Sequence, residues 1–374
     1  MIEPERMTFI LRRSFGSAGA ARRVLYSGMQ PSGSVHLGNY LGAIRPWSRV
    51  DAAQYDNVLF CAADLHAMSL LSTASAQQRQ QVAASGQATS VRSAPVLLPY
   101  LMPNVRRFVA TLLACGIDGG RVSIYRQSAV PAHCELLWLL SCVAPLGRLQ
   151  RQTQFKDKQG TDPTLALLSY PVLMAADVLL FNATHVPVGE DQRQHLELAV
   201  ALARIFNNLA EQSVFVEPQP LGLDARARRI QSLADPRVKM SKSDPLDRAR
   251  INLTDSADEI ASKIRRAVTD ADARIVYDAA ARPGVANLLD ICAELRDTTP
   301  EALLAQRAFG SASDLKQYTI DTLVEHIVPI GQRIAQLESD QSSTIDTVLF
   351  LGAQRAQSIA QRQLQHIKTI VGLL

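Results

Sequence analysis

The segment 24–64 constrains the fold of this chain more than any other. An apolar run at 24–27 has the composition of a buried strand, and a turn region rich in glycine, proline and serine follows at 28–34. A helix is then expected over about 35–45, and 57–64 is a second apolar strand with a polar end. Strand, glycine-rich loop, helix and strand in this order predict the opening of a parallel, nucleotide-binding α/β sheet.

The chain has 374 residues, of which 47% are hydrophobic, so two folded domains are expected. Its net charge of +4 fits RNA contact through a local basic patch but does not demand it. No apolar run reaches the length that spans a membrane. The five cysteines are scattered without a C-x-x-C spacing, so neither a disulfide framework nor a zinc site is expected.

Residues 1–23 have an unusual charge pattern. Glu3 and Glu5 are the only acidic residues before Asp51, while arginines punctuate a stretch rich in serine, alanine and glycine. This composition is typical of an organellar transit peptide and predicts a mitochondrial matrix protein. The alternative interpretation is a disordered basic tail on a cytoplasmic protein.

Beyond the first strands, the sequence predicts a division into parts. We expect a catalytic α/β domain over 24–244, interrupted at about 70–104 by a flexible, acid-free insertion. An all-helical domain is expected over 245–342, and the last helix, within 343–374, should pack back on the catalytic domain. Ser256 and Glu259 match a capping box that opens a helix. The expected helices after the insertion are 135–149, 165–182, 192–207, 260–268, 284–296, 300–307, 313–328, 331–337 and 343–371.

The segment 31–40 is the first of three polar, glycine-bearing segments. A helix start exposes unpaired N–H groups and a partial positive charge, and both favour phosphate. His36 and Asn39 are three residues apart and therefore share one helix face, from which both can donate hydrogen bonds to ATP. A His-x-x-Asn pair alone would be an ordinary helix surface.

The second and third segments are 186–192 and 239–243. In the second, Gly189 permits a sugar to approach closely, and Asp191 can accept hydrogen bonds from both ribose hydroxyls or cap the following helix. The third places two lysines and two hydroxyls within five residues, which can hold several phosphate oxygens at once.

These three segments, in this order, resemble the signature regions of the class I aminoacyl-tRNA synthetases, and most closely the tryptophanyl-tRNA synthetases of the bacterial and organellar type. His36 and Asn39 stand at the first and last positions of the family's HIGH signature, and 239–243 matches its KMSKS signature. The resemblance covers about 24–374. It implies a Rossmann-like catalytic domain with a parallel sheet and an all-helical anticodon-binding domain.

The resemblance also implies residue roles in ATP chemistry. Catalytic roles fall to Lys239, Lys242, His36, Asn39 and, from a less specific match at 155–158, Lys158. The implied ATP contacts are Gln30, which also lies near the amino-acid carboxylate, Gly38, Gly189, Asp191, Ile230, Met240, Ser241 and Ser243.

The implied tryptophan pocket centres on 170–177. Asp177 is a lone carboxylate among apolar residues, and a buried acid needs a partner that an indole N–H can supply. The alternative is that Asp177 caps a helix or pairs with an arginine. Tyr26 stands against the indole, where the family commonly has phenylalanine. The other implied contacts are His66, Tyr170, Met174, Val186, Val188 and Gln192.

The function implied is activation of L-tryptophan by ATP and its transfer to tRNA(Trp) for organellar protein synthesis. The implied enzyme is a homodimer that uses Mg²⁺ on the ATP phosphates, with no metal ligated by protein and no membrane contact. A tyrosyl-tRNA synthetase would need polar groups that read a phenol hydroxyl, and an adenylyltransferase would not need the helical domain. A catalytically silent tRNA-binding paralogue should have lost the phosphate-handling residues.

Overall fold

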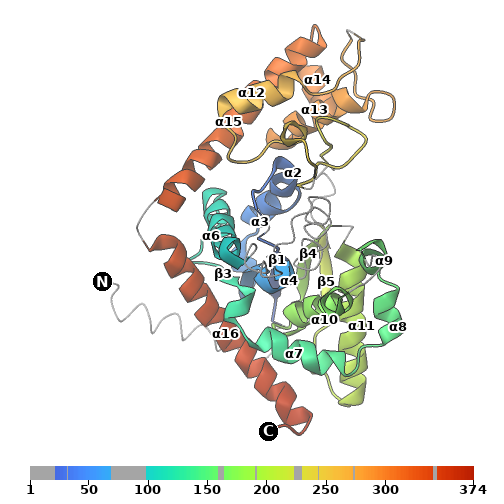
Figure 1. Ribbon diagram of the computed structural model, residues 1–374, viewed down its shortest axis with the longest axis vertical. Coiled ribbons are helices and arrows are strands. Elements are labelled where there is room, and N and C mark those ends of the chain that lie inside the picture. The colour runs from blue at the N-terminus through green and yellow to red at the C-terminus, as the bar shows by residue number, and fades with distance from the viewer. Residues whose placement is uncertain are drawn as a thin grey trace, which may run out of the picture.

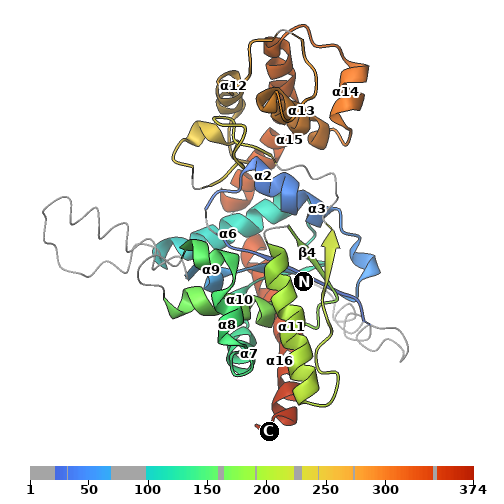
Figure 2. The same ribbon diagram turned by 90° about the vertical axis from the view of Figure 1, so that its right-hand side faces the viewer.

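The structure is a computed structural model of the whole chain (Figure 1). It describes residues 22–31, 33–68, 98–158, 164–189, 192–222, 230–242, 244–272, 274–339 and 343–374. A part built on a β-sheet occupies most of the molecule, and a purely helical part lies at one end of the long axis (Figures 1 and 2).

Five parallel strands form the sheet, in the order β3-β2-β1-β4-β5. This arrangement confirms the expected nucleotide-binding α/β sheet, although its two edge strands were not predicted. The strands are β1 (Val24–Met29), β2 (Asn57–Ala62), β3 (Ser123–Arg126), β4 (His185–Val188) and β5 (Gln219–Gly222).

Helices cover both faces of the sheet, as a parallel sheet requires (Figure 2). In the sheet domain they are α2 (Leu37–Asn39), the π-helical segment η1 (Tyr40–Ile44), α3 (Arg45–Ser48), α4 (Asp64–Met68), α6 (Leu98–Ala114), α7 (Ala132–Ser141), α8 (Leu146–Gln150), α9 (Thr153–Lys158), α10 (Leu165–Leu179) and α11 (Arg193–Leu209). The helical domain comprises α12 (Ala257–Arg265), α13 (Pro283–Leu295), α14 (Pro300–Gln306) and α15 (Ala312–Ser339), and α16 (Thr344–Ile370) ends the chain. None of the helices in the described residues is both long and apolar enough to cross a membrane.

The pleat of β1 divides the core into two layers. Leu25 points into the layer shared with α3 and α6, and Tyr26 points into the opposite layer, shared with α7, α10 and α11. The first layer continues without a break into the helical domain, because Ile251 and Ile260 belong to the same apolar cluster as Leu25. The two domains therefore share part of their hydrophobic core.

The first helix differs from the expected span 35–45. It begins after His36 and continues through Pro46 to Ser48, with a π-helical turn in between. Proline lacks an N–H and clashes with the carbonyl four residues earlier, so a regular α-helix would break here. Because the Arg45 N–H instead bonds to the Tyr40 carbonyl, the widened turn lets the helix pass through Pro46.

Two other helices depart from expectation. α6 begins at Leu98, so the last part of the predicted insertion, which was expected to end near Val105, is helical; residues 69–97 lie outside the described part. α15 runs unbroken through Pro329, where two separate helices were expected. The capping box of Ser256 and Glu259 is confirmed at the start of α12.

Helix α16 lies along β3, and a glycine makes this approach possible. A Cβ atom added to Gly352 would lie 1.9 Å from the carbonyl oxygen of Ile124, well inside van der Waals contact. Arg355, about one turn further along, donates to the carbonyls of Gly119 and Val122 at 2.7 and 3.1 Å. Backbone contact at one position and a charged clamp at the next hold the helix in register.

We predict that Gly352→Ala lowers the free energy of unfolding by at least about 2 kcal/mol, because the added methyl group must displace backbone atoms. Urea unfolding followed by circular dichroism measures this change. Gly310→Ala is the control, since a Cβ there meets no atom within 4 Å. Equal stability of the two variants would contradict the packing of α16 described above.

Candidate active site

The sheet contains a topological switch point between β1 and β4. The chain leaves β1 toward β2 on one side, while β4 lies on the other side. The backbones of β1 and β4 share one registered pair, Leu25 with His185. Further along, the Ser27 hydroxyl donates to the Pro187 carbonyl at 3.3 Å. Ligands of parallel α/β sheets bind at such a switch point, beyond the carboxyl ends of the strands.

His36 forms the start of the helix that follows β1. It is 3% exposed, and its extended backbone places it as the N-cap of α2. The Asn39 N–H donates to His36 Nδ1 at 3.4 Å, and Asn39 Oδ1 accepts from the His36 N–H at 3.5 Å. This reciprocal pair fixes the two side chains relative to each other.

The charge state of His36 follows from its surroundings. Burial lowers its pKa, and the cations of Lys242, Arg250 and Lys239 lower it further, to about 4. The imidazole is therefore neutral near pH 7. Because Nδ1 accepts a hydrogen bond, the proton lies on Nε2, which remains a donor suited to a phosphate oxygen.

The lysine-rich segment meets this helix start. A Cβ added to Gly38 would lie 3.7 Å from the Cβ of Met240, and the charges of Lys239 and Lys242 act on His36, so the two signature segments lie next to each other. Met240 is buried, and its N–H donates to the carbonyl of buried Ile230 at 3.1 Å. Lys239 is exposed, while Lys242 is partly buried and its pKa is lowered by that burial. Ser241, partly buried, lies between Met240 and Lys242.

Asp177 lies in the last turn of α10, is 4% exposed and belongs to a polar network. Gln127 Nε2 donates to Oδ1 at 2.7 Å, and His133 Nδ1 also lies 2.7 Å from Oδ1. His66 Nε2 lies 3.0 Å from Oδ2. His133 Nδ1 lies close enough for an ion pair but makes no hydrogen bond, so among the described residues Oδ2 accepts only from His66. A carboxylate has about four acceptor positions, which leaves one on Oδ2 for a further donor.

These contacts determine the ionisation of Asp177. Burial alone would raise its pKa, but the interactions with His133 and His66 outweigh burial and lower the pKa to about 2. Asp177 is therefore a carboxylate at neutral pH. A buried carboxylate with a free acceptor position is a selective partner for a donor-only group.

Gln127 and His133 were missed by the sequence analysis. Both are completely buried, and His133 Nε2 lies 3.1 Å from the hydroxyl of Tyr125, which extends the network to β3. The alternative partners expected for Asp177, a helix end or an arginine, are not what the described residues provide. Gln127 directly follows β3, at the edge of the sheet where ligands bind, but this position could be recognised only if β3 had been predicted.

A second polar chain joins the pocket to the start of α11. The Tyr170 hydroxyl lies 2.9 Å from His195 Nε2, and His195 Nδ1 lies 3.1 Å from Gln192 Oε1. Burial raises the pKa of Tyr170 to about 12, so its hydroxyl stays protonated. Gln30 donates to the His66 carbonyl at 3.3 Å. The structure thus brings together predicted residues from four separate segments.

Apolar side chains surround this network. Tyr26 is buried and stacks on Phe181, with ring centroids 5.6 Å apart. Its hydroxyl has no hydrogen-bond partner among the described residues, and burial raises its pKa. Met174 lies one helical turn before Asp177 and is half-buried, and Val186 and Val188 lie on the same face of β4.

Three predicted site residues lie wholly or partly outside the described part of the chain. Asp191 and Ser243 lie outside the described residues, next to Gly189 and Lys242, which are described. Lys158 belongs to the last turn of α9, but only its backbone is described. In the described part of the chain, no group of three His, Cys, Asp or Glu side chains could hold a metal ion.

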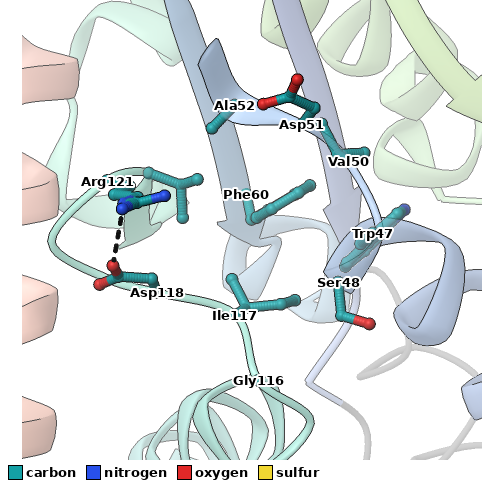
Figure 3. A pocket seen from close by; sticks show the side chains of 11 residues that line it. Trp47, Ser48, Val50, Asp51, Ala52, Phe60, Gly116, Ile117, Asp118 and Arg121 are labelled. Carbon is teal, nitrogen blue, oxygen red and sulfur yellow. Dashed lines mark ion pairs between the residues drawn. The ribbon is translucent and has the colours of Figure 1, made fainter.

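A cavity of about 170 Å³ lies away from these residues (Figure 3). Its lining includes Trp47 and Phe60, whose rings stack 4.9 Å apart, and the exposed ion pair of Arg121 and Asp118. Most of its walls come from α3 and from the segments that lead into β2 and β3. It therefore lies toward the amino ends of the strands, away from the candidate active site.

Comparison with known proteins identifies the relatives of this arrangement. Residues 20–327 match the family described as tRNA synthetases class I (W and Y). The tryptophan–tRNA ligase of Brucella melitensis is 40% identical over 94% of this chain and 98% of its own length. That of Thermosynechococcus vestitus is 40% identical over 93% of this chain and 99% of its own length.

Solved structures show the same relationship. The tryptophanyl-tRNA synthetase of Mycoplasma pneumoniae superposes with a TM-score of 0.76 at 31% identity, covering 94% of this chain and 98% of that one. The Campylobacter jejuni enzyme in complex with ADP and tryptophan superposes with a TM-score of 0.72 at 29% identity, covering 94% of this chain and 99% of that one. The tyrosyl-tRNA synthetase of Aeropyrum pernix, at 20% identity and a TM-score of 0.61, shares the fold.

Proposed function

We propose that this chain, which belongs to the class I aminoacyl-tRNA synthetases of the tryptophan and tyrosine branch, makes tryptophanyl-tRNA from L-tryptophan, ATP and tRNA(Trp). It is a tryptophan–tRNA ligase. The observation that carries the mechanism is the closeness of the His36 helix start to the Met240 segment, at the topological switch point of the sheet.

The reaction has two steps. A carboxylate oxygen of tryptophan attacks the α-phosphorus of ATP, the bond to the bridging oxygen breaks, and pyrophosphate leaves with the electron pair. A terminal ribose hydroxyl of the tRNA then attacks the acyl carbon and AMP leaves. Neither step requires a nucleophilic side chain, so we assign the residues to orientation and charge stabilisation.

We assign the phosphate chemistry to the two signature segments. His36 Nε2 and the Asn39 amide donate to phosphate oxygens, while Lys239, Lys242 and Lys158 neutralise the charge that develops on the departing pyrophosphate. ATP enters as its magnesium complex, in which the phosphates and water supply the oxygen ligands of Mg²⁺.

The remaining assignments place adenosine and the amino acid. Gly38, Ile230, Met240, Ser241 and Ser243 contact the nucleotide, with Gly189 and Asp191 at its ribose. Gln30, Tyr170 and Gln192 hold the amino and carboxylate groups of tryptophan. The indole lies between Tyr26, His66, Met174, Val186 and Val188, with Asp177 at its N–H.

We predict that Lys242→Ala folds normally and forms tryptophanyl-adenylate ~10²–10³-fold more slowly, because one cation aimed at the developing phosphate charge is lost. Tryptophan-dependent exchange between ATP and pyrophosphate measures this rate, and exchange with tyrosine, which should be absent, tests the tyrosyl alternative. Lys368 of α16, which pairs with Glu135 of α7, provides a control as Lys368→Ala. Wild-type activation by Lys242→Ala would refute its assignment.

The acceptor position left on Asp177 Oδ2 supports its assignment to the indole N–H. We predict that the wild type uses the benzothiophene analogue of tryptophan at least about 10²-fold less well in kcat/KM, because sulfur leaves the carboxylate without its donor. Asp177→Ala should be poor with tryptophan and should narrow this gap. Asp64→Asn, which alters a different buried carboxylate, should keep the wild-type preference for tryptophan over the analogue. A full wild-type preference in Asp177→Ala would show that Asp177 does not read the indole.

We propose a homodimer formed through α7 and its neighbours. Trp138 of α7, Leu146 of α8 and Leu165 of α10 are 70, 57 and 77% exposed, and α10 packs against both α7 and α8. Large apolar side chains gathered on adjoining helices are typical of an association surface. A second copy of this chain is the occupant that we propose.

We predict that Trp138→Glu converts the dimer to a monomer, because a charge would be buried without a partner. Sedimentation velocity at several protein concentrations measures the oligomeric state. Phe350→Glu is the control, since Phe350 is a comparably exposed aromatic residue, 61% exposed, on α16. A wild-type monomer, or a Trp138→Glu dimer, would refute this interface.

We propose a mitochondrial matrix location, supported by the acid-poor, arginine-punctuated stretch at 1–23. A fusion of residues 1–23 to a fluorescent reporter is expected to enter mitochondria in a eukaryotic cell. Replacing Arg12, Arg13, Arg22 and Arg23 by glutamine should abolish import. A cytosolic reporter in the unmodified fusion would favour the basic-tail interpretation.

A further inference from the structure

We propose that helix α13 of the helical domain braces the two phosphate-handling segments against each other, with Asn287 and Arg45 as positioning residues at the two ends of the brace. Asn287 connects α13 to the lysine-rich segment, and Arg45 connects α13 to the helix that begins at His36. This inference rests on the proposed function, because it concerns how that same site keeps its geometry.

The first connection lies in the amino-terminal half of α13. Asn287 is 4% exposed, and its side chain satisfies both backbone groups of Gln231: Oδ1 accepts from the N–H at 2.9 Å, and Nδ2 donates to the carbonyl at 3.1 Å. Gln231 in turn forms an antiparallel β-bridge with Lys239, and the carbonyl of neighbouring Ile230 accepts a hydrogen bond from the Met240 N–H. Asn287 therefore holds the backbone on which the lysines are mounted.

The second connection lies at the carboxyl end of α13. The guanidinium of Arg45 donates to the carbonyl oxygens of Glu294 and Leu295, the latter at 3.0 Å, and to Asp297 Oδ2 at 3.0 Å. These carbonyls belong to the last turn of a helix, where partners within the helix are lacking and positive charge is favoured. Arg45 is only 11% exposed at its side chain, so water screens this contact little.

Arg49 makes a similar but weaker contact. Its guanidinium lies 2.7 Å from the same Asp297 oxygen, yet the two side chains are 49 and 58% exposed. Exposed ion pairs contribute little, about 0–1 kcal/mol. Because it touches neither carbonyl of α13, Arg49 offers a matched control for Arg45.

The geometry of α13 suits a brace. Residues 287 to 295 span about 12 Å of helix at 1.5 Å per residue, and most side chains of α13 are buried. At its start, a Cβ on Gly284 would lie 2.2 Å from the Val268 carbonyl, so the helix cannot shift toward that segment. A fixed rod that holds the lysine segment near one end and the His36 helix at the other sets the distance between them.

The His36 helix is held at two points as a result. The Leu37 N–H donates to the Ile251 carbonyl at 2.8 Å, and the Leu253 N–H donates to the Val35 carbonyl at 3.0 Å, which fixes the helix start. Arg45 fixes the same helix two turns later, and so its direction. The tryptophan network of Asp177 lies in the sheet domain and has no contact with α13 among the described residues.

Loss of the brace should therefore affect the ATP-dependent step and the binding of tryptophan differently. Displacing a catalytic group by about 1 Å can cost about 10²-fold in rate, so loosening the brace should impair the ATP-dependent step. It should not change the affinity for tryptophan. A general loss of structure would instead lower both together.

The test measures tryptophan-dependent ATP–pyrophosphate exchange and thermal unfolding in Asn287→Asp and Arg45→Met. Each is expected to lower kcat/KM for ATP about tenfold or more while leaving KM for tryptophan unchanged. In the double variant the second substitution should add little, because either one releases the brace. Arg45→Lys, which keeps the charge but has one nitrogen for three acceptors, should fall between Arg45→Met and wild type.

Two controls carry the same chemical changes elsewhere. Arg49→Met removes the exposed pair only, and Asn207→Asp alters an asparagine that clamps the backbone of Phe215 in the sheet domain at 2.8 and 2.9 Å. Both should retain the wild-type kcat/KM for ATP. Wild-type ATP kinetics in Asn287→Asp and Arg45→Met, or a proportional fall in the ATP and tryptophan parameters, would overturn the brace. An absence of exchange in the wild type would instead refute the proposed function.

Discussion

The parallel pairing of β1 with β2 on one side and β4 on the other is the constraint on which the site depends. Parallel strands deliver their following segments to the same edge of the sheet, so the turns after β1 and β4 must both open there. The helix beginning at Leu37 and the helix beginning at Arg193 thus follow strands whose carboxyl ends lie at the same edge of the sheet. The signature segments lie far apart in sequence and approach each other because Ile251 and Leu253, which follow the second segment, bond to the backbone on both sides of His36.

Burial favours the neutral form of two ionisable groups of the site, His36 and Asp177, but their neighbours give them opposite charge states. Around His36, desolvation and neighbouring cations act in the same direction, so the imidazole remains neutral. Around Asp177, two histidines overcome desolvation, so the carboxylate remains charged. The site consequently offers a neutral donor beside cations for phosphate and a charged acceptor inside an apolar pocket for an N–H group. Both states arise from neighbours contributed by other segments.

The helical domain is integral to this chemistry. It shares an apolar cluster with the His36 side of the sheet, and its backbone pairs with residues on both sides of His36. An isolated sheet domain would lack the partners of Val35, Leu37, Arg45 and Gln231. The two domains thus differ in secondary structure, but hydrogen bonds that hold the site connect one domain to the other.

The sequence by itself determined the parallel sheet, the helical second domain and the identity of the signature segments, because apolar runs, glycine loops and capping residues are local features. It also predicted that Asp177 would be buried and need a partner. Only the tertiary structure decided which partners Asp177 has, since Gln127 and His66 lie 50 and 111 residues away and converge through strand order. The hydrogen bonds from Arg45 to α13 likewise depend on packing between distant segments. Edge strands β3 and β5 escaped prediction for the same reason: four residues are too few to show a period, and pairing with a neighbour defines them as strands.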